Sequence, residues 1–297
     1  MHGTVDGFSY GLVTPVVACL MACLGGALGL HCTTRALLVA GSWRPGWLAL
    51  ASAATGSGIW TAHFVAMIGF TVEETPVHYD RTATYTSLAA AVAMVGVGIF
   101  IVGYRGATGS ALFTGGTITG LGIATMHYLG MVAMRLNGTL EYDTLTVAAS
   151  VVIGVVAATT ALWAAGQGRG PLWTVGASLV MGLAVSGMHY TGMAAVSVHL
   201  HGTGGTSVAG ESPAALLGPM LAGPLSFLLL AGAVVLLGHR TAAGGPARIP
   251  AERKPGVPAG EHVFHTARRP LSRSRRVPAR APRRGPARER FRTPQNR

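Results

Sequence analysis

Residues 111–134 read ALFTGGTITGLGIATMHYLGMVAM, an apolar run that holds one histidine, His127, and no charged side chain. At ~1.5 Å per residue, such a run is long enough to cross a hydrocarbon layer of about 30 Å as a helix. Six further runs of this kind occur at residues 12–31, 47–70, 84–104, 146–165, 173–198 and 214–238. Because lipid cannot satisfy open backbone groups, we predict an all-α fold, a bundle of seven transmembrane helices.

The charge distribution divides the chain into two parts. The protein of 297 residues is 50% hydrophobic, 11% charged and carries a net charge of +12. Residues 1–240 contain seven arginines and seven acidic residues, so the whole excess lies in residues 241–297. Soluble domains carry roughly 25% charged residues, which argues against a water-soluble globule for the first part. We predict a membrane domain at residues 8–238 and a disordered Arg/Pro-rich tail at residues 239–297, which has too few apolar residues for a core.

The connections between the apolar runs alternate in charge. Those after the first, third and fifth runs contain arginine and no acidic residue, whereas those after the second, fourth and sixth contain acidic residues. Positively charged loops usually stay in the cytoplasm. We therefore predict an N-terminus outside the membrane and a cytoplasmic C-terminus, with the basic tail attracted to anionic lipid headgroups. Specific binding to nucleic acid is not expected.

A short motif recurs in the second, fourth and sixth runs. It reads Thr-Ala-His63-Phe-Val-Ala-Met67, then Thr-Met126-His127-Tyr-Leu-Gly-Met131, then Gly-Met188-His189-Tyr-Thr-Gly-Met193. Successive histidines are separated by the length of two runs and two loops, and the pairs Tyr79-Asp80 and Tyr142-Asp143 keep the same phase. The first six helices are therefore predicted to form three repeated helix pairs, with the seventh helix outside them.

The motif places metal-binding side chains at one level of the membrane. A histidine and the methionine four residues later share one helix face, so three imidazoles and three thioethers would converge around a common axis. This donor set suits copper better than magnesium, calcium or zinc. Met126 and Met188, which directly precede His127 and His189, point about 100° away and would bind metal only if the helix is distorted, or would pack beside the site. The predicted metal ligands are His63, Met67, Met126, His127, Met131, Met188, His189 and Met193.

Met-His-Tyr-Leu-Gly-Met and Met-His-Tyr-Thr-Gly-Met resemble the signature of the MHYT domain family of bacterial integral membrane proteins. The resemblance covers about residues 8–200 and implies a multi-pass protein of the bacterial inner membrane. It further implies a non-enzymatic sensor that binds copper near the outer face and detects oxygen, carbon monoxide or nitric oxide. The chain departs from the pattern at Ala62 and Ala66, and no output domain follows the seventh run, so a separate cytoplasmic signalling partner is expected.

Two other functions fit the same histidines. A copper transporter would need a polar path to the cytoplasmic side, but the inner halves of the runs hold almost no ionisable residue. A haem protein would use two of the histidines as axial ligands. A retinal protein is excluded because the single lysine, Lys254, lies in the tail.

Some residues near the motif have competing interpretations. Asp80 and Asp143 either cap the helices that follow them or contact a ligand histidine. The aromatic residues after the histidines are predicted to form a belt at the membrane surface. The three cysteines are expected to be small packing residues, and His199 and His201 to be solvated loop residues.

Overall fold

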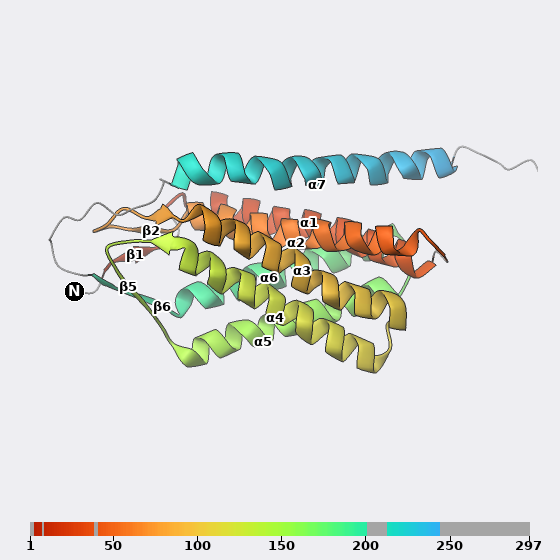
Figure 1. Cartoon of the computed structure of the whole chain (residues 1–297), viewed down its shortest axis with the longest axis horizontal. Coiled ribbons are helices and arrows are strands. Elements are labelled where there is room, and N and C mark those ends of the chain that lie inside the picture. The colour runs from red at the N-terminus through yellow and green to blue at the C-terminus, as the bar shows by residue number, and fades with distance from the viewer. Residues whose placement is uncertain (1–2, 8, 39–40, 201–212, 244–297) are drawn as a thin grey trace, which may run out of the picture. The chain divides into compact units, whose positions relative to one another are not determined.

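The computed structural model describes residues 3–7, 9–38, 41–200 and 213–243, which form seven helices (Figure 1). The predicted tail lies outside the described residues from residue 244 onward. The helices are α1 (Val13–Leu38), α2 (Arg44–Ile68), α3 (Arg81–Arg105), α4 (Gly109–Ala133), α5 (Thr144–Gly166), α6 (Pro171–Ala194) and α7 (Pro213–Ala243). Each overlaps one of the seven apolar runs, so the helical prediction is confirmed.

Five of the described helices are long and apolar enough to cross a membrane, namely α1, α3, α5, α6 and the Leu217–Val235 part of α7. The chain is therefore a multi-pass membrane protein. The two motif-bearing helices α2 and α4 are not among the five. Nearly every residue of α2 from Ala51 to Met67 is buried, and α4 is rich in glycine and threonine. A helix that faces other helices rather than lipid does not need an apolar surface, which explains their lower hydropathy.

Helices α1 to α6 contact one another in chain order, and α6 returns to α1, so the six form a closed ring. Helix α7 packs outside this ring on α2 and α1. Glycines allow the closest approaches: a Cβ built on Gly25 of α1 would lie 2.6 Å from the Cα of Gly58 in α2. On α3, a Cβ built on Gly98 would lie 2.4 Å from the carbonyl oxygen of Gly115 in α4. Small residues at these crossings let the backbones touch, as in other membrane bundles.

Three short antiparallel strand pairs close one end of the ring, here named the strand end (Figure 1). Each pair joins the segment before an odd-numbered helix to the segment after the next even-numbered helix. The sequence interpretation did not include these strands. The pairs are β1 (Val5–Asp6) with β2 (Thr71–Val72), β3 (His78–Tyr79) with β4 (Met134–Arg135), and β5 (Gly138–Tyr142) with β6 (Val196–Leu200).

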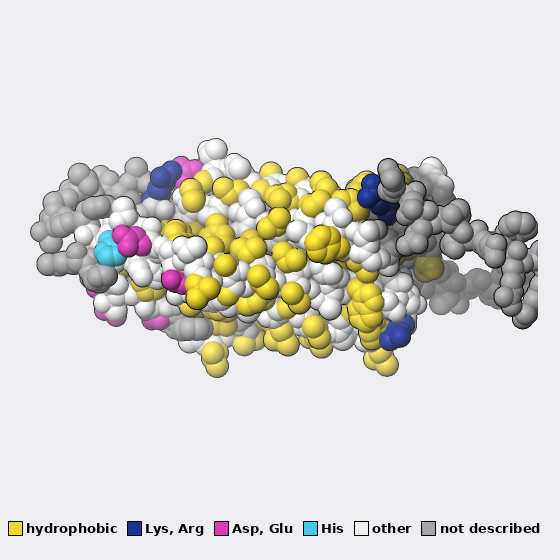
Figure 2. Space-filling model, turned by 90° about the horizontal axis from the view of Figure 1, so that it is seen from below, with side chains coloured by type: hydrophobic (Ala, Val, Ile, Leu, Met, Phe, Trp, Pro, Cys, Tyr) yellow, Lys and Arg dark blue, Asp and Glu magenta, His cyan; other side chains and the backbone are white. Residues whose placement is uncertain are grey.

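The surface has the pattern of a membrane protein. Figure 2 shows hydrophobic side chains over the middle of the visible face and charged side chains toward its two ends. Large apolar side chains such as Phe113, Leu145 and Leu172 are more than 70% exposed. Such exposure is unfavourable in water but costs nothing against lipid tails.

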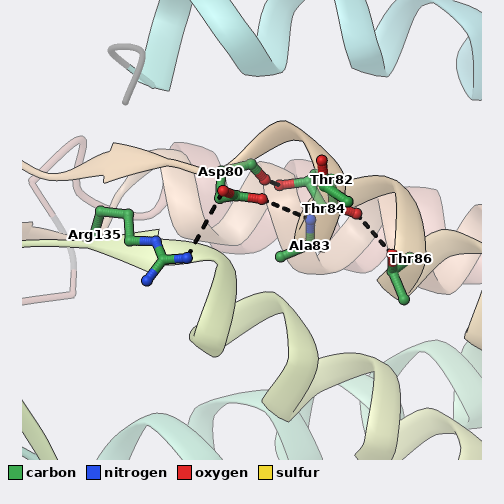
Figure 3. A network of polar contacts seen from close by, with 6 residues as sticks. All are labelled: Asp80, Thr82, Ala83, Thr84, Thr86 and Arg135. Atoms are coloured by element: carbon green, nitrogen blue, oxygen red, sulfur yellow. Dashed lines mark hydrogen bonds and ion pairs between the residues drawn. The ribbon is translucent and has the colours of Figure 1, made fainter. Parts of the chain in front are cut away.

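Aspartates cap α3 and α5, two helices that begin at the strand end, which confirms the capping interpretation. The Asp80 carboxylate accepts a hydrogen bond from the Ala83 amide at 2.8 Å, and Arg135 lies 3.7 Å from the same carboxylate (Figure 3). Asp143 accepts from the Thr146 amide at 2.8 Å and from the Thr146 hydroxyl at 2.6 Å. These bonds satisfy amide groups that the first turn of a helix leaves open.

Candidate metal centre

Three histidines from three different helices meet inside the ring, close to the strand end. His63 lies on α2, His127 on α4 and His189 on α6, each five or six residues before its helix ends. Their side chains are 4%, 0% and 6% exposed. Within the part of the chain that the structure describes, they form the one group of histidine, cysteine or acidic side chains that could hold a metal ion. We call these three residues the histidine triad.

The triad is nearly symmetric. The Nδ1 atom of His63 lies 3.1 Å from that of His189 and 3.2 Å from that of His127, and the third pair is also separated by 3.2 Å. Ring centroids are 5.0 to 5.1 Å apart, and the ring planes meet at 78° to 88°. The three Nδ1 atoms therefore form an almost equilateral triangle, with each ring edge-on to the next.

Hydrogen bonds alone cannot satisfy this triangle. A neutral imidazole carries one proton, so a given Nδ1 atom either donates or accepts but never both. Among three mutually adjacent Nδ1 atoms, at least two are of the same kind, which sets two protons or two lone pairs against each other. A cation between them would accept all three lone pairs at once. The arrangement is consequently better suited to a bound cation than to an empty polar cluster.

The spacing also fits a metal ion. Histidine nitrogen binds metals such as zinc at about 2.0 to 2.1 Å, and three nitrogens 3.1 to 3.2 Å apart are compatible with such bonds. Imidazole suits copper, zinc, iron and nickel, and nothing in the nitrogen positions alone distinguishes these metals. The residues present therefore fit a metal, and the choice of metal depends on any further ligands.

Glycine residues of the motif make room for the rings. A Cβ built on Gly130 would lie 2.2 Å from the Nε2 atom of His63, and one built on Gly192 would lie 2.5 Å from Nε2 of His127. The same Nε2 atoms are buried and have no hydrogen-bond partner among the described residues. Gly130 follows His127 by three residues, and Gly192 follows His189 by three. Each glycine thus lets the histidine of the preceding repeat pack against its helix. This role was not predicted from the sequence, although the repeated glycine was the signal for it.

The predicted methionine ligands fall into three groups. Met126 and Met188 line a small cavity of about 10 Å³ together with all three histidines. Met67 and Met193 line a second pocket that also includes His189. Met131 is fully buried in the apolar core and lines neither of these two cavities. The methionine before the histidine, which helix geometry placed away from the shared face, therefore borders the triad after all.

Each histidine has an aromatic ring behind it. Phe64, Tyr128 and Tyr190 lie edge-on to the preceding histidine, at centroid distances of 4.7, 4.8 and 4.9 Å. The predicted aromatic belt is wrong for Phe64, which is completely buried. It packs against Tyr79 at 6.1 Å, and Tyr128 packs against Tyr142 at 5.9 Å, so the Tyr-Asp landmarks support the aromatic residues of the motif.

Two serines anchor this second layer. Ser87 accepts a hydrogen bond from Trp60 Nε1 at 3.0 Å, and its own hydroxyl donates to the Thr84 carbonyl. Ser150 lies 2.8 Å from the Tyr128 hydroxyl and donates to the Val147 carbonyl. Each serine follows an aspartate, Asp80 or Asp143, by seven residues, but its hydrogen-bond partners are evident only in the structure.

His199, which follows α6 in the chain, does not join the histidine triad. His199 is on β6, where its Nε2 atom is 3.1 Å from the Glu141 carboxylate of β5. It belongs to the β5–β6 strand pair rather than to the triad, and His201 lies outside the described residues.

Comparison with known proteins identifies a repeat in this region. The MHYT family model, described as "Bacterial signalling protein N terminal repeat", matches residues 56–115 and 120–178. The two matched segments contain His63 and His127, and the third motif, around His189, lies beyond them.

The relatives are bacterial signalling proteins. A bifunctional diguanylate cyclase/cyclic di-GMP phosphodiesterase, MucR of Pseudomonas aeruginosa, is 37% identical over 197 residues, which is 65% of this chain and 29% of MucR. An uncharacterized signaling protein of Caulobacter vibrioides is 36% identical over 161 residues, 52% of this chain and 19% of the relative. Signaling protein YkoW of Bacillus subtilis is 29% identical over 198 residues, 64% of this chain and 24% of YkoW. The similarity thus spans less than a third of each relative, and no solved structure matches the chain.

Proposed function

Since this chain belongs to the MHYT family through its repeats at residues 56–178, we propose that it is a membrane sensor that binds a metal ion at the histidine triad. One observation carries the proposal: three Nδ1 atoms lie 3.1 to 3.2 Å apart in a buried site where hydrogen bonds cannot satisfy all of them. Buried ionisable side chains within a membrane are costly, and they commonly mark functional sites.

Copper is the proposed metal. Two thioether-bearing residues, Met126 and Met188, border the same small cavity as the imidazoles. A mixed set of imidazole nitrogen and thioether sulfur favours Cu(I) and Cu(II), whereas zinc sites usually add thiolate or carboxylate ligands. When bound, copper would supply a centre with affinity for small neutral molecules such as oxygen, carbon monoxide or nitric oxide.

The protein's own residues would hold the site dry and rigid. The aromatic side chains of Phe64 and Tyr128 back two of the histidines, and the glycines Gly130 and Gly192 fix the distance between ring and helix. Because the histidines come from α2, α4 and α6, any change in their spacing would shift three helices relative to one another. Small helix shifts of this kind are a known means of passing a signal across a fold.

The remaining topology is part of the same proposal. The described helices would form a seven-span bundle at residues 8–238 in the bacterial inner membrane, built from three repeated helix pairs plus α7. The strand end would face outward, and a basic tail at residues 239–297 would lie in the cytoplasm against anionic lipid. A cytoplasmic signalling protein would read the output, as expected for a relative of signalling proteins such as MucR.

Metal analysis of the purified full chain tests the proposal. We expect about one copper ion per protein after reconstitution, a carbon monoxide or nitric oxide response in the copper spectrum, and loss of both in His127→Ala. His199→Ala is the matched control, because this histidine pairs with Glu141 of β5 instead of joining the triad. Wild-type protein without stoichiometric metal would refute the metal site. A Soret absorption band would show that the histidines bind haem instead of copper.

Copper transport is a second candidate, favoured by one observation. A cavity of about 30 Å³, lined by residues of all six ring helices, shares Ile59 and Val185 with the cavity at the triad. Copper uptake into vesicles separates the two functions. A sensor should take up no more copper than empty vesicles, whereas uptake that is lost in His127→Ala would establish transport.

A further inference from the structure

The three repeats are not equivalent at the position that faces the histidine rings. The second and third repeats have Gly130 and Gly192 there, and a Cβ on either would overlap the Nε2 atom of the neighbouring histidine. The first repeat has Ala66. Ala66 and His189 line the same two cavities, so the third side of the triad has a methyl group where the other two sides have glycine.

A pocket of about 220 Å³ lies on the Ala66 side of the triad, between the ends of α2 and α6. Of the three triad histidines, His189 alone lines it. His189 also lines the small cavity inside the triad, so this side chain lies between the two spaces. The Nε2 atoms of His63 and His127 are fully buried, and His189 is not among the residues with a buried, unpaired ring nitrogen.

The pocket reaches the surface at the strand end. Val5 of β1 and Ala194, the last residue of α6, line it and are both exposed. Its lining includes the thioethers of Met67 and Met193, together with the imidazole of His189 and the phenol of Tyr190. None of these lining residues carries a carboxylate for a hydrated divalent ion, whereas thioethers bind soft monovalent ions such as Cu(I) and Ag(I).

We propose that this pocket is the passage by which a soft monovalent metal ion reaches the histidine triad, with Met67 and Met193 as transfer ligands and His189 as the first histidine of the triad that the ion meets. The proposal rests on metal binding at the triad. It adds the route, the oxidation state of the arriving ion and a separate function for two methionines that the motif alone assigned to the central site. Ala66 keeps the route open, because glycine at this position would let His189 close against α2.

Chemical labelling tests the passage without any metal. Diethyl pyrocarbonate modifies neutral imidazole nitrogen, so in metal-free protein His189 should react at least about tenfold faster than His63 or His127 if the pocket admits the reagent. Ala66→Gly should slow that reaction, and Gly7→Phe should slow it by filling the pocket, since a Cβ on Gly7 meets nothing within 4 Å. Gly109→Phe, equally open but at the first turn of α4, is the matched control. Equal labelling of the three histidines, or no labelling of His189, would overturn the passage.

Silver, a redox-inert substitute for Cu(I), tests the transfer ligands. The Met67→Leu/Met193→Leu double variant preserves side-chain volume, and we expect its Ag(I) association rate to fall about tenfold while the final stoichiometry stays unchanged. Met131→Leu, in the apolar core, should bind silver at the wild-type rate. If Gly7→Phe does not fold, Ala194→Phe provides a second plug at the exposed rim.

The two proposals fail in different ways. Protein that never binds silver or copper refutes metal binding at the triad, whatever the labelling pattern. Protein that binds metal at an unchanged rate in the plugged and double variants refutes the passage and leaves the triad site standing.

Discussion

The Nδ1 atoms of His63 and His189 lie 3.1 Å apart, although the residues are separated by 126 positions in the chain. This contact joins α2 to α6, two helices that are not neighbours in the ring and otherwise touch little. Two lone pairs or two protons at that distance repel each other in a buried site, so the contact is favourable only when a proton or a metal ion lies between the rings.

Metal binding should therefore stabilise the folded protein. At a metal concentration one hundred times the dissociation constant, a single site adds about 2.7 kcal/mol to the free energy of unfolding. We expect Cu(I) or Ag(I) to raise the melting temperature of the wild type, as measured by light scattering or intrinsic fluorescence in detergent. The His127→Ala variant should show no such rise, and a similar rise in that variant would contradict binding at the triad.

Adding a methyl group behind a histidine should weaken the site. Gly130→Ala places a Cβ 2.2 Å from His63 Nε2, so either the ring or α4 must move. We expect a destabilisation of about 1 to 3 kcal/mol and a clear loss of metal affinity. Gly187→Ala on α6, where a Cβ meets nothing within 4 Å, is the control. Titration with a competing chelator measures the affinity, and equal affinities in the two variants would be contrary to the predicted role of Gly130.

Removing the hydroxyl of Ser87 should destabilise the fold without emptying the site. Trp60 Nε1 then loses its closer acceptor and keeps the Thr84 carbonyl at 3.3 Å, so we expect a loss of about 1 kcal/mol in unfolding free energy. Thr86→Ala removes a hydroxyl that bonds only within the exposed surface of α3 and should change stability less. Thermal unfolding compares the two variants, and metal stoichiometry should be unchanged in both.

The Asp143 cap should make the start of α5 sensitive to acid. Hydrogen bonds from Thr146, first from its side chain and then from its amide, lower the pKa of this carboxyl below its ordinary value. A depressed folded-state pKa means that the cap stabilises the helix at neutral pH and that this effect is lost as the pH falls through the lowered pKa. At neutral pH, amide hydrogen exchange in the first turn of α5 should therefore be faster in Asp143→Ala than in the wild type. The loss of protection that the wild type shows when acid protonates the cap should be absent from this variant.

The Glu141→Ala variant is the control for that experiment. This residue lies on β5 two positions earlier and does not cap α5, so its removal should leave exchange in α5 unchanged. Similar exchange in the wild type and in Asp143→Ala would show that the cap does not hold the first turn.

Most of the helical framework was predictable because it depends on local composition. Apolar runs of sufficient length occur at all seven helices, and helix bounds differ from the predicted runs by a few residues. The strand pairs were not predictable. Tyr79 and Met134 pair across β3 and β4 although each strand has only two residues, too few for any alternating pattern to appear.

The sequence by itself determined that three histidines lie at one level of the helix bundle, because equal repeat lengths bring His63, His127 and His189 to the same end of parallel helices. Only the tertiary structure decided which atoms of these rings face one another, that Met126 borders them, and that Ala66 and His189 line a pocket that reaches the surface. The rotation of a helix about its axis and its distance from a neighbour depend on close contacts such as Gly25 with Gly58, which join residues far apart in the chain. A repeat pattern determines the spacing of residues along each helix, but the packing between helices determines the direction in which each side chain points.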